Sequence, residues 1–267
     1  MIELLAYPFF LRALAAVALI SIAMAVTGVY VMSRRMIFIS GGITHACFGG
    51  LGLGYFLGFS PIALAAVFAV GGSLGVDWLS RRARVRSDSA IAVIWAVGMA
   101  LGVLFIFLGD GYVPQLNTFL FGNVLTVSNV DLWIFLGFTL LLLIFFILFR
   151  RAIEAISFDR DFARVNHLPV TFIDTAMTVF VSIAIVLSIR LVGIMLLISL
   201  LSLPPIIAET RCRRYQGLVI SSAFIALIGG TGGLLFSAWI GVPASATIVL
   251  LLALLFIVAK LLPGKSV

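Results

Sequence analysis

Long apolar runs, each bounded by a cluster of arginines, are the feature that most constrains this chain. A helix needs roughly 20 mostly apolar residues to cross the hydrocarbon core of a bilayer. Hydrophobic residues make up 63% of the 267 residues and charged residues only 10%, whereas a soluble domain carries roughly 25% charged residues. So few polar side chains cannot cover a soluble surface. We therefore expect residues 1–267 to form a single, membrane-embedded domain.

The apolar runs predict an all-α membrane protein, a polytopic bundle of eight or nine transmembrane helices. The runs are continuous, whereas the strands of a membrane β-barrel alternate apolar and polar residues. We interpret the first run as a retained span and not as a cleaved signal peptide. Segment 191–208 is short for a span, and segment 110–129 is ambiguous. The candidate spans are 9–31, 36–58, 61–79, 89–109, 130–149, 170–189, 191–208, 216–235 and 245–261.

The basic residues predict the orientation of the chain. With nine spans, 15 of the 17 Lys and Arg residues fall on one side, and the exceptions are Arg12 and Arg190. Because Lys and Arg accumulate in cytoplasmic loops, we expect the N-terminus outside and the C-terminus in the cytoplasm. The net charge of +7 then reflects topology, and no nucleic-acid partner is expected.

The longest cytoplasmic connection, residues 150–170, mixes charged residues with regularly spaced apolar ones. We predict a short helix at about residues 155–167, with acidic residues near its start that suit the helix dipole and with Pro169 after its end. A helix with one apolar face either rests on lipid or docks on a partner, and both interpretations stay open at this point. The predicted apolar face consists of Ile156, Phe158, Phe162 and Val165.

Five segments, in the same order along the chain, resemble the permeases of bacterial ABC importers of the zinc and manganese type. Each segment alone is weak, but together they cover most of the chain from about residue 12 to residue 260. The segments are "DSAIAVIWAVGMALGVLFI", "FLFGNVLTVSNVDL", "SFDRDFARVNHLPV", "SIRLVGIMLLISLLSLP" and "GVPASATIVLLLALLFIVA".

This resemblance implies a transmembrane permease subunit that forms the translocation path of an ATP-driven divalent-metal importer in a bacterial inner (cytoplasmic) membrane. The implied partners are a second permease copy or a near relative, cytoplasmic ABC ATPases, an extracytoplasmic metal-binding protein and the lipid bilayer. The chain itself has no GxxxxGK[ST] phosphate loop, so we expect no enzymatic activity and no bound cofactor, only a transiently held metal. The residues implied to couple to the ATPase are Phe158, Asp159, Asp161, Phe162 and Arg164.

The stretch "ISGGITHACFGGLGLGYFLGF", residues 39–59, places a histidine inside a predicted span. The family carries an acid and a histidine four residues apart there, a spacing that puts both side chains on one helix face. His45 matches the histidine, but Gly41 stands at the acid position. We expect His45 to line the path and to bind the passing metal, with ligands completed by the second subunit or by weak donors nearby. The alternative is a histidine that only packs and hydrogen-bonds between helices.

Gly41 in place of the acid bears on the cargo. Loss of a hard carboxylate ligand weakens the case for manganese more than the case for zinc, and it is also compatible with a metal chelate as cargo. A stand-alone secondary transporter or channel usually needs charged residues within the membrane, and the predicted spans are nearly free of them. An intramembrane enzyme would need a catalytic partner for His45. The remaining glycines near His45 favour close helix packing, and we expect Asp77 to pair with the arginine cluster 81–86.

Overall fold

The computed structural model describes residues 7–109, 122 and 124–261, and within these residues all regular structure is helical. The all-α class is therefore confirmed. Seven of the described helices are long and apolar enough to cross a membrane. They are α1 (Pro8–Ser33), α3 (Pro61–Arg81), α4 (Ser87–Leu108), α6 (Asn129–Phe158), α8 (Val170–Glu209), α9 (Tyr215–Ile240) and α10 (Ala244–Leu261).

Helix α2 (Ile39–Leu57) coincides with the predicted span 36–58 but is not among these seven. It is 19 residues long and contains several glycines and His45. Segment 110–121, part of the ambiguous region, lies outside the described residues. The count of eight or nine spans stays a prediction. Two short elements complete the described structure, namely η2 (Val124–Thr126) and α7 (Arg160–Val165).

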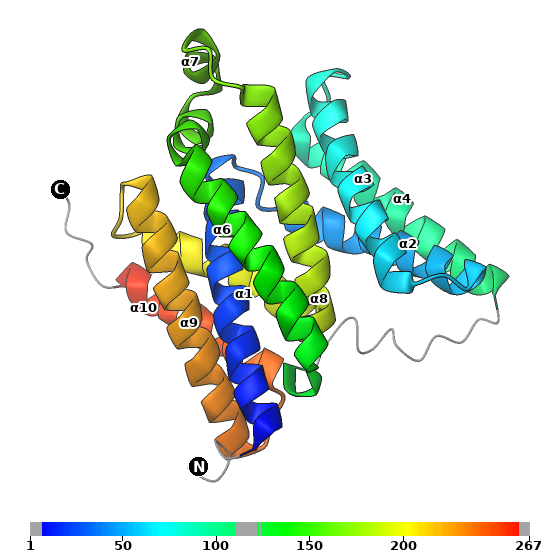
Figure 1. The fold of residues 1–267 in the computed structure, drawn as a ribbon, viewed down its shortest axis with the longest axis vertical. Helices are drawn as coiled ribbons and strands as arrows, with labels where there is room; N and C mark the ends of the chain where they lie inside the picture. The colour runs from blue at the N-terminus through cyan, green and yellow to red at the C-terminus, as the bar shows by residue number, and fades with distance from the viewer. Residues whose placement is uncertain (1–6, 110–121, 123, 262–267) are drawn as a thin grey trace.

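Helices α1, α6, α8, α9 and α10 pack into a bundle (Figure 1). Helices α1 and α8 lie at its centre. In an apolar 18-residue stretch of each helix, 56% of the residues of α1 and 67% of those of α8 are buried. Most of their buried side chains are aliphatic or small, among them Ile20, Ile185 and Leu200. Burial of both helices on most sides explains why their apolar residues run continuously and do not form a stripe.

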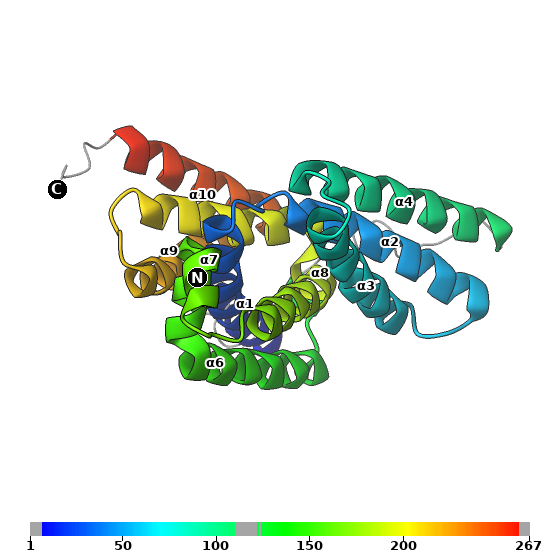
Figure 2. The same cartoon turned by 90° about the horizontal axis from the view of Figure 1, so that it is seen from above.

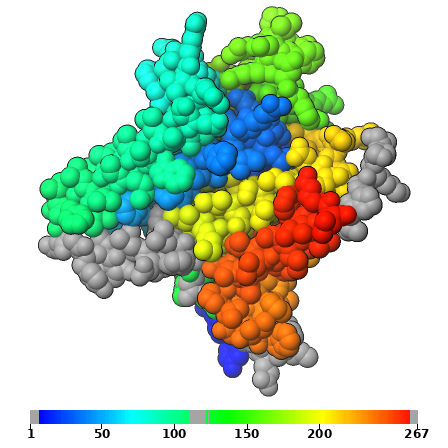
Figure 3. All heavy atoms as spheres, turned by 180° about the vertical axis from the view of Figure 1, so that it is seen from behind, coloured from blue at the N-terminus to red at the C-terminus, as the bar shows by residue number. Residues whose placement is uncertain are grey.

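Helix α8 consists of two segments that meet at Gly193. The backbone of this residue has φ 76° and ψ 171°, a conformation that glycine adopts without a steric penalty. Gly122 also packs tightly here, since an added Cβ would lie 2.1 Å from the Val192 carbonyl carbon. The two segments correspond to the predicted spans 170–189 and 191–208. The second one, yellow in Figure 3, crosses the back of the bundle beside α10.

Helices α2, α3 and α4 form a separate three-helix wing beside the bundle (Figures 1 and 2). Glycines bring these helices together: an added Cβ on Gly50 would lie 2.3 Å from the Leu64 carbonyl oxygen of α3, and one on Gly52 would lie 2.6 Å from the Gly102 carbonyl oxygen of α4. This close approach agrees with the packing role predicted for the glycines. The wing meets the bundle where α2 and α3 pack against α8.

The short helix α7 lies at one extremity of the molecule, which we call the α7 end (Figure 1). The C-terminal ends of α1 and α3 and the start of α8 lie at this same end. Arg190 belongs to the opposite end, where its guanidinium forms an ion pair with Asp131 at the start of α6, with an N–O distance of 3.0 Å. The described structure therefore separates Arg190 from the arginines at the α7 end, as the sequence pattern predicts.

Candidate functional site

His45 lies in the seam between α2 and α4 and is half-buried. Its ring stacks on the indole of Trp95, with the ring centroids 4.3 Å apart and the planes inclined by 10°. Its Nδ1 atom is 3.3 Å from the Sδ atom of Met99. Trp95 and Met99 are four residues apart, so they share one face of α4. One side of the imidazole is thus covered by an aromatic ring and one nitrogen faces a thioether.

The surroundings of His45 supply few further metal ligands from this chain. Within the part of the chain that the structure describes, no three His, Cys, Asp or Glu side chains lie close enough together to hold a metal ion. Cys47 is fully buried, as expected for a residue on the opposite face of α2 from His45. The Gly41 position has room for a side chain, because an added Cβ would meet only the Trp95 ring, at 3.5 Å.

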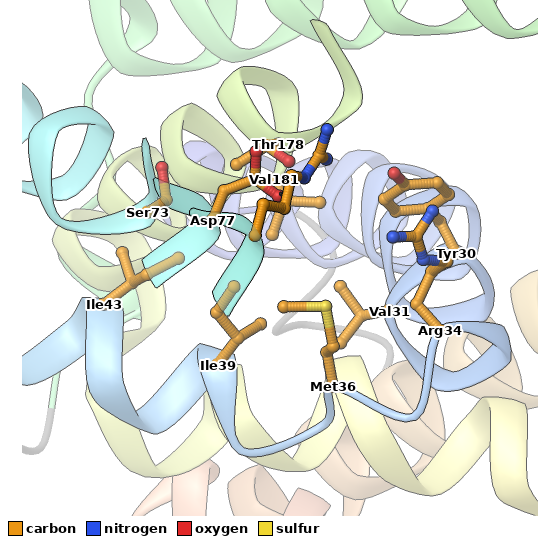
Figure 4. A pocket seen from close by; sticks show the side chains of 11 residues that line it. Tyr30, Val31, Arg34, Met36, Ile39, Ile43, Ser73, Asp77, Thr178 and Val181 are labelled. Atoms are coloured by element: carbon orange, nitrogen blue, oxygen red, sulfur yellow. Dashed lines mark ion pairs between the residues drawn. The ribbon is translucent and has the colours of Figure 1, made fainter. Parts of the chain in front are cut away.

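A small cavity lies between the wing and the bundle (Figure 4). Residues of α2 that line it include Ile39 and Ile43, whereas His45 is directed at α4 and is not part of the lining. The polar side chains of the lining gather near the α7 end. The full lining consists of Tyr30, Val31, Arg34, Met36, Ile39, Ile43, Ser73, Asp77, Arg81, Thr178 and Val181.

A buried carboxylate, Asp174 in the first turns of α8, organises the polar residues behind this cavity. Its side chain is 1% exposed. The Oδ1 atom accepts hydrogen bonds from the hydroxyl of Tyr30 (3.0 Å) and from Nη1 of Arg34 (2.7 Å). The Oδ2 atom pairs with Nη2 of Arg81 at 3.1 Å and with Nη2 of Arg160. We call Asp174 and its four partners the carboxylate hub.

The carboxylate hub joins four elements at the α7 end. Tyr30 and Arg34 come from the end of α1, Arg81 is the last residue of α3, and Arg160 is the first residue of α7. Arg81 also pairs with Asp77, through an Nε–Oδ1 distance of 2.5 Å, so the predicted pairing of Asp77 with the arginine cluster is confirmed. Partial burial lowers the pKa of the Arg160 guanidinium, while the charge of Asp174 acts in the opposite direction.

Asp174 is the candidate that the sequence patterns did not single out. It falls within the predicted span 170–189, near its start. A carboxylate in an apolar span is costly unless it is paired, and this cost was the available signal. The partners, however, are separated from Asp174 by 14 to 144 residues in sequence, so only the folded structure identifies them.

The predicted coupling segment is divided between two helices. Helix α6 continues to Phe158, Asp159 is extended, and α7 covers only Arg160–Val165, so the single helix predicted at 155–167 is wrong. The side chain of Asp159 caps α7 by accepting hydrogen bonds from the backbone nitrogens of Asp161 (3.0 Å) and Phe162 (2.9 Å). Capping by Asp is common because the first helical N–H groups lack partners within the helix.

The apolar face predicted for this segment is also corrected. Ile156 belongs to α6 and is 1% exposed, so it lies in the core and does not share a face with the other three. Phe158, Phe162 and Val165 are 66%, 60% and 77% exposed. Arg164 pairs with Asp161 on the surface, at an N–O distance of 3.3 Å. The α7 end therefore presents apolar side chains outward, flanked by charged ones.

The chain is similar in sequence to one family of known proteins and to several individual membrane proteins. The sequence model of the ABC 3 transport family matches residues 6–262. An uncharacterised membrane protein of Synechocystis is 34% identical over 97% of this chain and 92% of its own length. The manganese transport system membrane protein MntC of Halalkalibacterium halodurans is 32% identical over 99% of this chain and 90% of its own length.

A solved structure agrees with the fold. The chain matched in PsaBC from Streptococcus pneumoniae, solved in complex with Fab, superimposes with a TM-score of 0.86. The match covers 98% of this chain and 94% of that chain, at 24% sequence identity. The wing and the bundle thus belong to an architecture already seen in an experimental structure.

Proposed function

This chain belongs to the ABC 3 transport family, and we propose that it is the membrane-spanning permease subunit of an ATP-driven importer of divalent metal ions. The observation that carries this proposal is the family match over residues 6–262, together with relatives named as metal transport proteins. ATP hydrolysis belongs to separate ATPase subunits. A stand-alone channel or secondary transporter does not account for this family membership.

The α7 end is the proposed docking site for the ATPase. Phe158, the last residue of α6, and Phe162 and Val165 of the short helix α7 are all exposed. Exposed aromatic side chains that enter a partner's pocket commonly dominate binding energy. Helix α7, with Asp159, Asp161 and Arg164 beside these side chains, therefore acts as the coupling helix in this proposal.

Substitution of Phe162 tests this docking site. Phe162→Asp should weaken association with the ATPase about 30-fold, the effect of losing a typical hot-spot residue. Phe38→Asp is the matched control, since Phe38 is 72% exposed at the start of α2 but lies outside α7. Pull-down of purified ATPase on the permease in detergent measures the effect. Equal association for both variants and the unchanged chain would contradict the docking role.

The arginine clusters at the α7 end support an orientation with this end in the cytoplasm of a bacterium. Labelling with a membrane-impermeant thiol reagent tests it in a Cys212→Ser background, where the remaining Cys47 is buried. Val242→Cys, between α9 and α10, should react from outside the cell, and Ala83→Cys, after α3, should not. The inverse pattern would reverse the proposed topology.

A second permease copy is proposed to pack on the wing and to complete the path near His45. Val93, Trp95, Val97 and Phe107 of α4 are exposed apolar residues, and α4 forms an outer surface of the wing in Figure 3. His45 offers one imidazole beside the thioether of Met99, which is too few ligands for a stable site. A site shared between two copies or held transiently suits an ion that must leave again.

The relatives differ in the metal for which they are named, so the cargo of this chain within the divalent-metal class is a separate question. Relatives are named for manganese and for chelated iron. The imidazole nitrogen of His45 and the thioether sulfur of Met99 suit zinc better than manganese. A metal chelate is the second candidate, since no three metal-ligating side chains gather within the described residues.

Uptake by the reconstituted complex tests the function. Vesicles that contain the permease, its ATPase and its binding protein should accumulate at least one of Mn²⁺, Zn²⁺ and Fe²⁺. They should do so only when ATP is present on the side of the membrane where the ATPase is bound. Accumulation without ATP would favour a channel or a secondary transporter. Accumulation of only a chelated metal would replace the free ion with the chelate as cargo.

A further inference from the structure

The carboxylate hub has no role in the proposed function as described so far, although it contains the most deeply buried charge of the described chain. Asp174 is buried beside three guanidinium groups that are 16% to 25% exposed. Because the carboxylate is buried, water cannot easily take the place of a lost partner. Removal of one partner from such a cluster therefore lowers the stability of the fold. The position of each arginine is therefore linked to the position of the others.

Helix α7 has few attachments to the rest of the molecule apart from this carboxylate hub. It is preceded by extended Asp159, with φ −146° and ψ 106°, and followed by a turn in which His167 has a positive φ of 56°. Ala163 is its buried residue, while Phe162 and Val165 face outward. The ion pair between Arg160 and Asp174 is thus its main polar attachment to the long helices.

The same carboxylate extends this attachment to the cavity between the wing and the bundle. Arg34 and Arg81, which pair with Asp174, are also part of the cavity lining (Figure 4). Arg160 and Arg81 share one oxygen, Oδ2. A movement of α7 that withdraws Arg160 leaves this oxygen to Arg81 alone and shifts the end of α3 relative to the end of α1.

We propose that Arg160 and Asp174 are positioning residues that transmit movement of α7 to the ends of α1 and α3, and so couple the action of the ATPase to uptake of the metal. The proposal rests on the proposed function, because it takes α7 as the helix that the ATPase moves. Neither residue needs to contact the cation. Arg160 acts through Asp174, and Asp174 acts through Arg34 and Arg81.

The first test measures uptake of metal per ATP hydrolysed in vesicles with the complete complex. Arg160→Gln should retain ATPase association and hydrolysis but should lower uptake per ATP about tenfold, within the 5- to 150-fold range typical of coupling between sites. Arg160→Lys, which keeps the charge, should restore part of the uptake. Arg82→Gln is the control, because Arg82 follows Arg81 directly, is exposed, and forms no ion pair within the part of the chain that the structure describes.

Two results of this test would overturn the proposal. One is unchanged uptake per ATP in Arg160→Gln. The other is a loss of uptake in strict proportion to a loss of folded complex, because a purely structural role predicts that proportion.

The second test does not depend on transport and so separates this proposal from the proposed function. Spin labels at Arg35→Cys and Ala83→Cys, in a Cys212→Ser background, report the distance between the ends of α1 and α3. This distance should differ between the nucleotide-free and the ATP-bound complex, and Arg160→Gln should abolish the difference. A complex that transports no metal would end the proposed function, yet a preserved difference in Arg160→Gln would still refute the link.

Discussion

The bundle and the wing solve the same packing problem in different ways. In the bundle, an apolar 18-residue stretch is 56% buried in α1 and 67% buried in α8, the central helices, but only 22% and 17% buried in the outer helices α6 and α10. In the wing, the corresponding stretches of α3 and α4 are likewise 22% and 17% buried. The bundle combines many fully buried aliphatic side chains with glycine contacts such as Gly28, whose added Cβ would lie 2.3 Å from the Leu201 carbonyl oxygen, whereas in the wing glycines form the contacts of α2 with both α3 and α4. The wing therefore leaves much of its apolar surface for lipid or for another subunit.

Their polar residues differ in the same way. At the boundary with the bundle, the Asp174 carboxylate has four partners and almost no exposed surface. Within the wing, His45 is half-buried, with one thioether and one aromatic ring beside it. A fully partnered buried charge stabilises one arrangement of helices, while a group with unfilled coordination is free to bind a ligand. We therefore expect the carboxylate hub to organise the fold, and the metal-binding role proposed for His45 stays a prediction.

The largest expected effect concerns the carboxylate hub. Asp174→Ala leaves three guanidinium groups without their shared carboxylate and should lower the free energy of unfolding by about 3–5 kcal/mol, the usual cost of breaking a buried ion pair. Asp77→Ala is the matched control, because its carboxylate is 25% exposed and pairs with Arg81. Exposed pairs contribute about 0.2–1 kcal/mol. Unfolding by SDS in mixed micelles measures both values, and similar costs would refute the organising role of Asp174.

A smaller effect is expected from the glycine packing of the wing. Gly50→Ala places a Cβ 2.3 Å from the Leu64 carbonyl oxygen, so α2 and α3 must move apart. Overpacking of this kind costs about 1–3 kcal/mol. Gly71→Ala in α3 is the control, because nothing lies within 4 Å of its added Cβ, and the better helix propensity of Ala should make it neutral or stabilising. Equal unfolding free energies for the two variants would contradict the glycine-dependent packing.

The comparison also explains how much the sequence predicts. Apolar runs and arginine clusters predict the helices of both the bundle and the wing, because the bilayer imposes length and hydrophobicity on each helix independently. The glycines of α2 predict close packing but not which helix approaches them. The carboxylate hub was not predicted, since it depends on long-range pairing of Asp174 with Tyr30, Arg34 and Arg81.

The coupling segment shows a second limit of sequence patterns. Residues 155–165 carry a helical spacing of apolar side chains throughout, so a continuous helix was the natural prediction. The side chain of Asp159 instead hydrogen-bonds to the backbone of Asp161 and Phe162 and begins a new helix. Asp competes with helical hydrogen bonding in this way when its side chain reaches nearby N–H groups. Ile156 is consequently buried with α6, while Phe158 and Phe162 remain exposed.

The smallest effect on folding and the sharpest test of the wing come from Gly41. Gly41→Asp adds a carboxylate four residues before His45, on the same face of α2, where an added Cβ would contact only the Trp95 ring. A carboxylate and an imidazole bind a divalent ion more tightly than an imidazole alone, so the dissociation constant for Zn²⁺ or Mn²⁺ should fall about tenfold, which corresponds to about 1.4 kcal/mol.

Gly41→Asn is the matched control for this substitution, because it adds the same volume without the charge and should leave metal affinity unchanged. The combination of Gly41→Asp with His45→Ala should lose the gain, since two groups that share a ligand are not additive. Calorimetric titration of metal into the purified complex measures the dissociation constant for the unchanged chain, the two Gly41 variants and the double variant. His45→Ala alone should strongly lower metal uptake in vesicles while ATPase association persists. If the gain from Gly41→Asp survives without His45, or if His45→Ala transports normally, His45 is a packing residue of the α2–α4 seam and the wing holds no metal ligand at this position.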